Sequence, residues 1–469
     1  MKKLFLFSAA CSLLFSASAQ SGWDLQQCIQ YAIKHNISLI QSSLGNEMNK
    51  NNLNRSKAAL FPNLNLGTNH VQNYGQTIDR FTNQFANTKV LSQSFFLSSS
   101  FTIWSGLNQF NTMKSNEYTY LSGLESQKQS ENDLSLNIAN AYISVIFTEE
   151  LNGIAKNQFE ITKEQFERTK KLVDAGSLAK SNEYDIKAQL ANEELNVTTT
   201  ENNYQLAMLN LVQLMNLDSS VNFSIVRPRI DIEGEQQLNY TVLDVYESAL
   251  SNQPSIKSSS YAIKSAEKSL AASKGRLSPS INFNASTGTG TSGLAEDIVS
   301  TTYVPTPIGS TSSGDIVYAP IAQYQTKLTP FNEQFKNNFN RSAGISISFP
   351  IFNGLANHTA IKNAELNLQS NRLQQDLVKQ NLYKTITQAY ANAKAALNKY
   401  FASKASVEAA GESFKYARQK YDAGAISAFD YNNAKTRLMS AESNLLQAKY
   451  DYIFKLKVLD YYQGKTLTF

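Results

Sequence analysis

Residues whose types could support chemistry are few in this chain and are not grouped. The three histidines, His35, His70 and His358, are scattered and lack the spacing of metal ligands. Cys28 has no nucleophile context, and the sequence contains no glycine-rich phosphate loop and no nucleophile elbow. Carboxylates are plentiful, but they alternate with lysine in helical patterns, where their ordinary role is solvation. We therefore expect no catalytic site, no metal and no cofactor, and the sequence argues against an enzyme.

The charge pattern argues against nucleic acid as a partner. The chain has 43 Lys+Arg and 38 Asp+Glu. These charges are spread along the sequence, and no block of lysine and arginine is present. After residue 19, no segment reaches the roughly 18 consecutive apolar residues that a transmembrane helix needs.

Residues 1–19 have the pattern of a secretory signal peptide. A basic start precedes an apolar run, and Ala17-Ser18-Ala19 forms a small-x-small cleavage site, so the mature chain is expected to begin at Gln20. Cys11 is an alternative lipidation site, but the apolar run continues past it. Cleavage leaves Cys28 as the remaining cysteine, which excludes an intrachain disulfide and indicates a bacterial envelope protein.

Two near-copies of one short segment organise the rest of the chain. Lys171–Leu178 reads KLVDAGSL, and Lys420–Ser427 reads KYDAGAIS. Each follows one long helical pattern and precedes another, and a glycine just past a helix end is the usual left-handed stop. Ser427 with Asp430 three residues later predicts a capping box. The sequence therefore predicts two long helical hairpins with similar tips.

Constant offsets between matching residues indicate an internal duplication. Gly176 and Gly424 differ by 248, and other aromatic and apolar positions agree at the same offset. Nearer the start of each half, Leu60-x-Pro62 matches Leu277-x-Pro279 at an offset of 217. The change of register, about 31 residues, places an insertion in the second half, and an insertion present in one copy marks a surface loop.

Two segments in each half change from a helical period to a period of two, which predicts strands. They are residues 63–68 and 97–104 in the first half, and 280–285 and 345–352 in the second. One face of these strands is apolar, and the other is mostly Ser, Thr and Asn. Four strands cannot close a barrel, and an open edge in lipid leaves backbone groups unpaired. The strands must either pack in a soluble sheet on the helices or share a barrel with other copies.

We expect the mature chain to consist of a first repeat, residues 20–225, and a second, residues 226–469. Each repeat contains a helix, two strands and a long helical hairpin. The segments between the strands, residues 70–94 and the longer 287–341, are rich in Asn, Gln, Ser, Thr and Gly, and are expected to be exposed outer loops.

The helical patterns after the strands are much longer than globular helices. The outbound helices are expected at about residues 107–173 and 355–421, roughly 100 Å each at 1.5 Å per residue. The return helices are expected at about residues 182–215 and 429–462. Apolar residues in steps of three and four form a coiled-coil seam: Ile386, Ala389, Ala393, Ala396 and Tyr400, with Ile138, Ala141, Val145 and Thr148 in the first half.

This order of elements resembles the TolC-like outer membrane efflux protein family over nearly the whole mature chain. Local matches are Leu60-Phe61-Pro62, Trp104-Ser105-Gly106, Phe352-Asn353-Gly354 and the two Ala-Gly tips. Residues 73–79, NYGQTID, are similar to the first outer loop of members from Bacteroidetes-type bacteria.

The resemblance implies a mainly α fold with a small β part. Three chains would share a 12-stranded β-barrel in outer-membrane lipid, and their helical hairpins would form an α-barrel in the periplasm. The expected function is a passive exit duct of a tripartite efflux or type I secretion system, coupled by a periplasmic adaptor to an inner-membrane efflux pump or secretion ATPase. The alternative is a trimeric coiled-coil structural or adhesive envelope protein without a pore. That alternative predicts a terminal binding domain and a simple heptad stalk, and the sequence has neither.

The resemblance also implies site residues. The tips would dock the adaptor through Asp174, Ala175, Gly176, Leu178, Asp422, Ala423, Gly424 and Ile426. The periplasmic gate would involve Asp430, at the position of the first of two acidic residues, and Asn433, at the second. Ile426 and Asn182 replace the Arg and Asp of the family's gate contact, so that contact is expected to be missing. Three copies of Asp430 around an axis would form an anionic ring that favours cations.

Overall fold

The computed structural model describes residues 22–87, 89–218, 223–228, 238, 240–465 and 467. The expected signal peptide and Cys11 lie outside these residues. The chain is mainly helical with a small β part, as predicted. It falls into two compact units, each built from both halves of the sequence. The helical unit comprises Met1–Asn49, Tyr120–Ala262 and Asn371–Phe469, and the sheet unit comprises Lys50–Thr119 and Ile263–Ser370.

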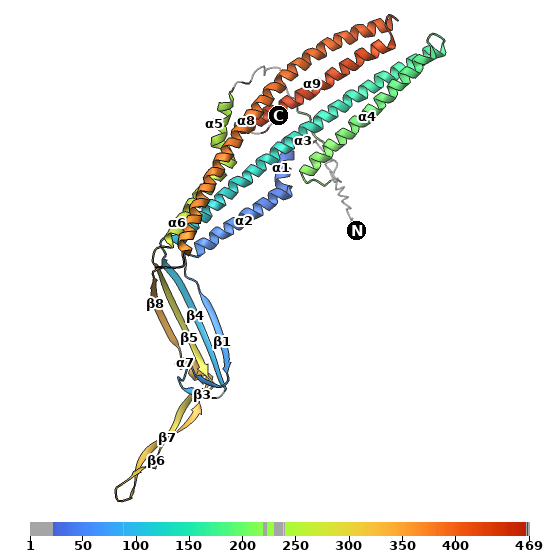
Figure 1. Ribbon diagram of the computed structural model, residues 1–469. Coiled ribbons are helices and arrows are strands. Elements are labelled where there is room, and N and C mark those ends of the chain that lie inside the picture. Colours follow the sequence, from blue (N-terminus) through green and yellow to red (C-terminus); the bar gives the residue numbers. More distant parts are fainter. Residues whose placement is uncertain are drawn as a thin grey trace, which may run out of the picture. The chain divides into compact units, whose positions relative to one another are not determined.

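Helices of equal length recur in the same order in the two halves (Figure 1). The short pairs have 11 and 22 residues in each half, and the long hairpins have 67 and 35. The first half contains α1 Leu25–His35, α2 Ile37–Ala58, α3 Asn108–Asp174 and α4 Lys180–Leu214. The second half contains α5 Val242–Asn252, α6 Pro254–Gly275, α8 Ala356–Asp422 and α9 Ala428–Tyr462. The long hairpins therefore begin and end within about two residues of the predicted positions.

The helical unit is held together along the predicted seams. In α3, Ile138, Ala141 and Val145 are buried in the largest apolar cluster, together with residues of α1, α4, α8 and α9. In α8, the small and apolar seam residues Ile386 and Ala393 have no exposed surface. Small side chains at this spacing let long helices approach closely, while their other faces remain exposed.

Four antiparallel strands form the main sheet, in the order β1-β4-β5-β8. Its outer strands are β1 (Asn65–Asn73) and β8 (Asn340–Ser348), and β4 (Val90–Trp104) pairs with β5 (Ser280–Ser292) at its centre. All four predicted strands are therefore present. The fourth was predicted to run through Phe352 but ends at Ser348, because Pro350 has no N–H to donate to the ladder.

The two faces of this sheet differ sharply in chemistry. Cross-strand partners on one face are Asn and Ser, such as Asn282 with Ser346 and Ser286 with Ser342. The other face carries Leu66, Ile345 and Ile347, which are 83%, 64% and 58% exposed. This division into an apolar and a polar face agrees with the predicted alternation of the strands.

The prediction of long loops between the strands was wrong. The segment expected at 70–94 extends β1 and β4 and contains a small hairpin, β2 (Gln76–Ile78) with β3 (Phe85–Asn87). The segment expected at 287–341 extends β5 and β8 and contains a second hairpin and a short helix: β6 (Glu296–Ser310), β7 (Ile316–Leu328) and α7 (Phe331–Asn337). Its Ser, Thr, Gly and Pro content hid an alternation of Val, Ile, Tyr and Thr, which favours strands. None of the described helices has the length and apolar character needed to span a membrane.

Candidate functional site

The tip between α3 and α4 is closed by a pair of backbone hydrogen bonds. The N–H of Gly176 donates to the carbonyl of Val173 at 3.0 Å, and that of Ser177 donates to Leu172 at 2.9 Å. Gly176 has a φ of +70°. Two such bonds around a left-handed residue make a Schellman motif, which satisfies carbonyls that the helix end would leave unpaired. The predicted glycine stop is confirmed.

The tip between α8 and α9 repeats this geometry. Gly424, with a φ of +68°, donates to Tyr421 at 3.0 Å, and Ala425 donates to Lys420 at 2.8 Å. The predicted docking residues are exposed to solvent in both tips, except for Ile426, which is half-buried. The two tips therefore present the same backbone turn with different side chains.

The first turns of the returning helices are built differently. In α9, the Ser427 hydroxyl accepts from the N–H of Asp430 at 3.1 Å and donates to its carboxylate at 2.7 Å. In a full capping box the carboxylate would accept from the backbone N–H of Ser427, so the structure shows half of the predicted box. In α4, Ala179 caps without a side chain, and the Asn182 amide donates to the Ala179 carbonyl at 3.3 Å.

Aromatic packing fixes the second tip. Tyr431 of α9 is buried and stacks on Tyr421 of α8, with ring centroids 4.8 Å apart, and its ring also contacts Phe414 at 5.5 Å. At the offset of 248, the positions of Tyr431 and Tyr421 correspond to Glu183 and Val173. The stacking of these two tyrosines is therefore a feature of the second hairpin and not of the first.

An ion pair joins the two hairpins of one chain near their tips. Arg168 Nη1 of α3 lies 3.0 Å from Asp422 Oδ1 of α8, and the two side chains are 65% and 47% exposed. Sequence reasoning missed Arg168, because it looks like any solvated helix charge and its partner is 254 residues away. The resemblance indicates a docking role for Asp422 and no contact with the other hairpin.

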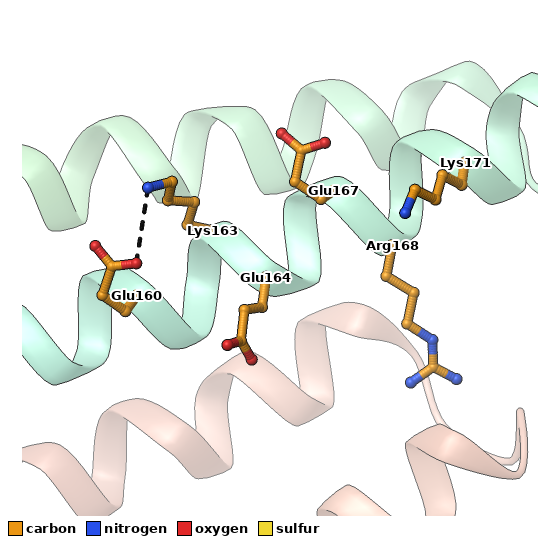
Figure 2. Close-up of a pocket in the computed structure, with 6 residues that line it drawn as sticks. All are labelled: Glu160, Lys163, Glu164, Glu167, Arg168 and Lys171. Atoms are coloured by element: carbon orange, nitrogen blue, oxygen red, sulfur yellow. Dashed lines mark ion pairs between the residues drawn. The ribbon is translucent and has the colours of Figure 1, made fainter.

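Arg168 belongs to a stripe of charges on one face of α3, which lines a shallow hollow (Figure 2). Within the stripe, Lys163 Nζ lies 3.7 Å from Glu160 Oε2. The members are spaced three and four residues apart, a signal that was available in the sequence. They are Glu160, Lys163, Glu164, Glu167, Arg168 and Lys171.

The sequence pattern of the family described as "Outer membrane efflux protein" matches residues 245–461. The outer membrane protein TolC of Escherichia coli (strain K12) is 24% identical over 456 residues, covering 97% of this chain and 84% of the relative. The chain is therefore TolC-like, and its second half carries the outer membrane efflux protein pattern. This likeness to transport channels decides against an enzyme.

Solved structures share the efflux-protein fold over almost the whole chain. CusC, in a study of its folding and transmembrane channel formation, aligns with a TM-score of 0.76 at 16% identity, covering 96% of both chains. The open state of the MtrE outer membrane channel of Neisseria gonorrhoeae aligns with a TM-score of 0.73 at 18% identity, covering 95% of this chain and 91% of that one.

In this efflux protein, the predicted gate residues lie near the beginnings of two helices, α4 and α9. Asp430 and Asn433 are exposed one turn apart on α9. Asn182 is half-buried at the start of α4, and its amide is engaged by its own helix. The structure thus places Asp430 and Asn433 on one surface and gives Asn182 a local capping contact.

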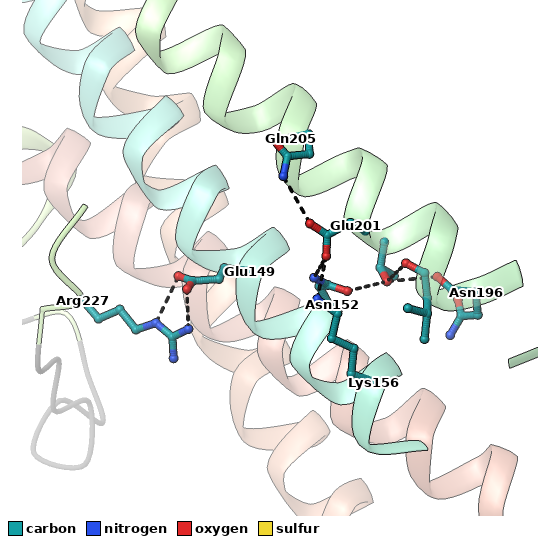
Figure 3. Close-up of polar contacts among 9 residues, drawn as sticks. Glu149, Asn152, Lys156, Asn196, Glu201, Gln205 and Arg227 are labelled. Atoms are coloured by element: carbon teal, nitrogen blue, oxygen red, sulfur yellow. Dashed lines mark hydrogen bonds and ion pairs between the residues drawn. The ribbon is translucent and has the colours of Figure 1, made fainter. Parts of the chain in front are cut away.

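A polar network joins α3 to α4 and holds the first hairpin in register (Figure 3). The buried Asn152 donates to Glu201 at 2.6 Å, and Lys156 lies 2.7 Å from the same carboxylate. Hydrogen bonds from Lys156, Gln205 and Asn152 lower the pKa of Glu201 to about 2. Beside this network, Arg227 Nη2 lies 2.6 Å from Glu149 Oε1 and ties the segment after α4 to α3.

Proposed function

We propose that three copies of this outer membrane efflux protein close one continuous export duct. The observation that carries the proposal is the four-stranded sheet with an exposed apolar face, a polar opposite face and two open edges. An open edge cannot face lipid, because its backbone N–H and C=O groups would lack partners. Three sheets of four strands each would close into a barrel of twelve strands.

The strand directions fit such a closure. Each neighbouring pair in the order β1-β4-β5-β8 is antiparallel, so the two edge strands, β1 and β8, run in opposite directions. The β8 edge of one copy can therefore pair with the β1 edge of the next in the same antiparallel manner. The apolar face, with Leu66, Ile345 and Ile347, would meet lipid, and the Asn and Ser face would line water.

The long hairpins would continue this pore as an α-barrel in the periplasm. We propose that the tips at 174–178 and 422–426 dock a periplasmic adaptor, which couples the duct to an inner-membrane pump or secretion ATPase. The exposure of the tip residues and the charged stripe on α3 support this role, because a partner can reach both. The duct itself would be passive.

Two further assignments rest on the sequence. The matching helix lengths support the division into repeats at 20–225 and 226–469, and an origin by duplication. Residues 73–79 support a Bacteroidetes-type member.

The decisive experiment is the detergent-corrected mass of the purified protein by light scattering. Three chains per particle are expected. A stable monomer would leave four strands unable to form a pore and would overturn the proposal. Conductance steps from the same particles in a planar bilayer would separate a channel from a trimeric structural protein without a pore.

A further inference from the structure

The hairpin β6–β7 extends from the sheet unit as a long ribbon of two strands (Figure 1). Most of its side chains are exposed, including large ones such as Tyr303 and Tyr324. An isolated two-stranded hairpin is marginally stable in water. Such a ribbon with exposed aromatic residues is expected to be covered in the working assembly.

The base of this hairpin is firmly built. The N–H of Thr329 donates to the Ala295 carbonyl at 2.8 Å, which closes the ribbon where it leaves the sheet. The buried Gln334 amide accepts from the Ser292 N–H at 2.7 Å and donates to the carbonyls of Ser292 and Thr329 at 3.0 and 2.8 Å. The ribbon is therefore held by a satisfied polar cluster.

Asp79, from the loop between β2 and β3, completes that cluster. Its buried carboxylate accepts from the Ser292 hydroxyl and from the N–H groups of Phe81 and Thr82 at 2.9 and 2.8 Å. Burial alone would raise the pKa of Asp79, but these hydrogen bonds outweigh it and lower that pKa. The base is thus tied to both outer segments of the sheet unit.

One face of the hairpin is made of tyrosine and proline. Residues directly opposite in the ladder point to the same face, and the pairs Tyr303–Ala322, Pro305–Pro320 and Pro307–Tyr318 follow one another on it. Tyr324, opposite Thr301, continues the same face. We name Tyr303, Pro305, Pro307, Tyr318, Pro320 and Tyr324 the Tyr–Pro face.

The prolines close the edges of the ribbon to further strands. Pro305 and Pro320 stand opposite each other, and because proline has no N–H, their pair must occupy a non-hydrogen-bonded site of the ladder. Their nitrogens, and that of Pro307 two residues along, therefore face the open edges, where they offer no donor. Proline on an edge discourages strand addition. A partner can therefore bind to the face of the hairpin but cannot add a strand to its edge.

The charges of the hairpin lie at its ends. Glu296, Asp297 and Lys327 are near the base, and Asp315 is in the turn. The Tyr–Pro face between them is uncharged and lacks the cationic groups that would attract phosphate headgroups. Uncharged tyrosine surfaces are typical of protein contacts.

We propose that the Tyr–Pro face binds the same face of the two other copies, so that three hairpins meet over the outer mouth of the barrel. The inference rests on the proposed trimer. The hairpin lies in the chain between β5 and β8, which are neighbours in the main sheet, and β8 is the edge proposed to join the next copy, so the hairpin leaves the sheet near that proposed contact. A barrel of three chains already holds the three hairpins close together, so their association costs little entropy.

Cysteine crosslinking tests this contact. Tyr303→Cys places a thiol on the Tyr–Pro face, and Thr302→Cys is the matched control on the opposite face. Cys28 is fully buried, and burial raises the pKa of its thiol to about 12, so it does not react under labelling conditions. With a short bismaleimide in membranes, Tyr303→Cys should give covalent dimers on a denaturing gel, because each chain offers one reactive thiol, and Thr302→Cys should not.

Excision of the hairpin gives a second readout. Because Ala295 and Thr329 are hydrogen-bonded, residues 296–328 can be replaced by two glycines without disturbing the base. The excised protein should still have the mass of three chains, and its conductance should rise several-fold as the outer mouth opens.

The outcomes separate this inference from the proposed function. A trimer in which Tyr303→Cys fails to crosslink would overturn the contact between hairpins and leave the duct intact. Protection of that thiol from a soluble maleimide in lipid but not in detergent, without crosslinks, would assign the face to the membrane and equally overturn it. A monomeric mass would overturn the duct itself.

Discussion

The ammonium group of Lys435 on α9 lies 2.5 Å from the hydroxyl of Thr162 on α3, and the two residues are 3% and 0% exposed. The carbonyl of Gln158 lies 3.5 Å from the same nitrogen, and the buried Glu193 of α4 is the neighbouring opposite charge. A buried amine at the meeting of three helices fixes how α9 packs against the first hairpin. Desolvation lowers the pKa of Lys435, and the attraction of Glu193 opposes that shift.

Thr162→Val should lower the apparent melting temperature of the protein. The variant removes an acceptor from a buried ammonium, which costs about 1–3 kcal/mol. Thr148→Val is the matched control, because the Thr148 hydroxyl donates to the carbonyls of Ser144 and Val145 in its own helix. Circular dichroism at rising temperature would measure both variants. Equal effects would contradict a specific role for the Lys435 contact.

The stability of the folded protein should depend on pH through Lys435. Its pKa is lowered in the folded state, so between that value and the ordinary value of 10.5 the folded chain binds fewer protons than the unfolded chain. The contribution of this group to stability therefore rises as pH increases through that window. Lys435→Met should flatten the rise in melting temperature from neutral pH toward pH 10. If the slope of melting temperature against pH is the same in Lys435→Met as in the wild type, other groups cause the pH dependence.

Alanine at either tip glycine should loosen the hairpin end. Gly176→Ala and Gly424→Ala place a Cβ on a left-handed residue, at a cost of about 1 kcal/mol each. Gly153→Ala within α3 is the control, because a Cβ there meets open space and alanine favours the helix. Hydrogen exchange at the tip amides should speed up in the first two variants only. If the tip amides of these variants exchange at the wild-type rate, the Schellman turn does not determine the stability of the tip.

Breaking the ion pair between the hairpins should favour an open duct. An exposed pair contributes at most about 1 kcal/mol, so Asp422→Arg should shift the closed-to-open ratio by up to about fivefold per copy and barely change melting. The charge swap Arg168→Asp with Asp422→Arg should restore the wild-type conductance in planar bilayers. A swap that conducts like the single variant would mean that the pair does not latch the hairpins.

Removal of the proposed anionic ring should reduce cation preference. Asp430→Asn takes one charge from each copy, so the reversal potential in a salt gradient should move toward anions and block by divalent cations should weaken. Asp185→Asn, an exposed carboxylate on α4, changes the net charge equally and should leave both unchanged. If Asp430→Asn has no effect on either measurement, the ring is not part of the conduction path.

Local patterns predicted the parts of this fold that local physics decides. Gly176 and Gly424 could be predicted because only glycine takes the left-handed conformation of a helix stop without cost. The long helices could be predicted because their apolar residues repeat with a helical period. The β6–β7 hairpin was missed because prolines and threonines made its alternation look like a loop. The contacts of Arg168 and Lys435 join residues 254 and 273 positions apart, and no spacing within one helix reports such a pair.

The pairing of β4 with β5 has a consequence for how the duct comes apart. It joins the two halves of one chain, just as β8 and β1 are proposed to join two chains. In a ring of three chains, each chain would contribute two similar strand pairs, β1–β4 and β5–β8. The contacts between neighbouring pairs would alternate. The β4–β5 contact lies within one polypeptide, whereas the β8–β1 contact joins two chains and is held by side chains and ladder hydrogen bonds alone. Heat would then break the β8–β1 contacts between chains first, releasing whole four-stranded sheets rather than single strand pairs.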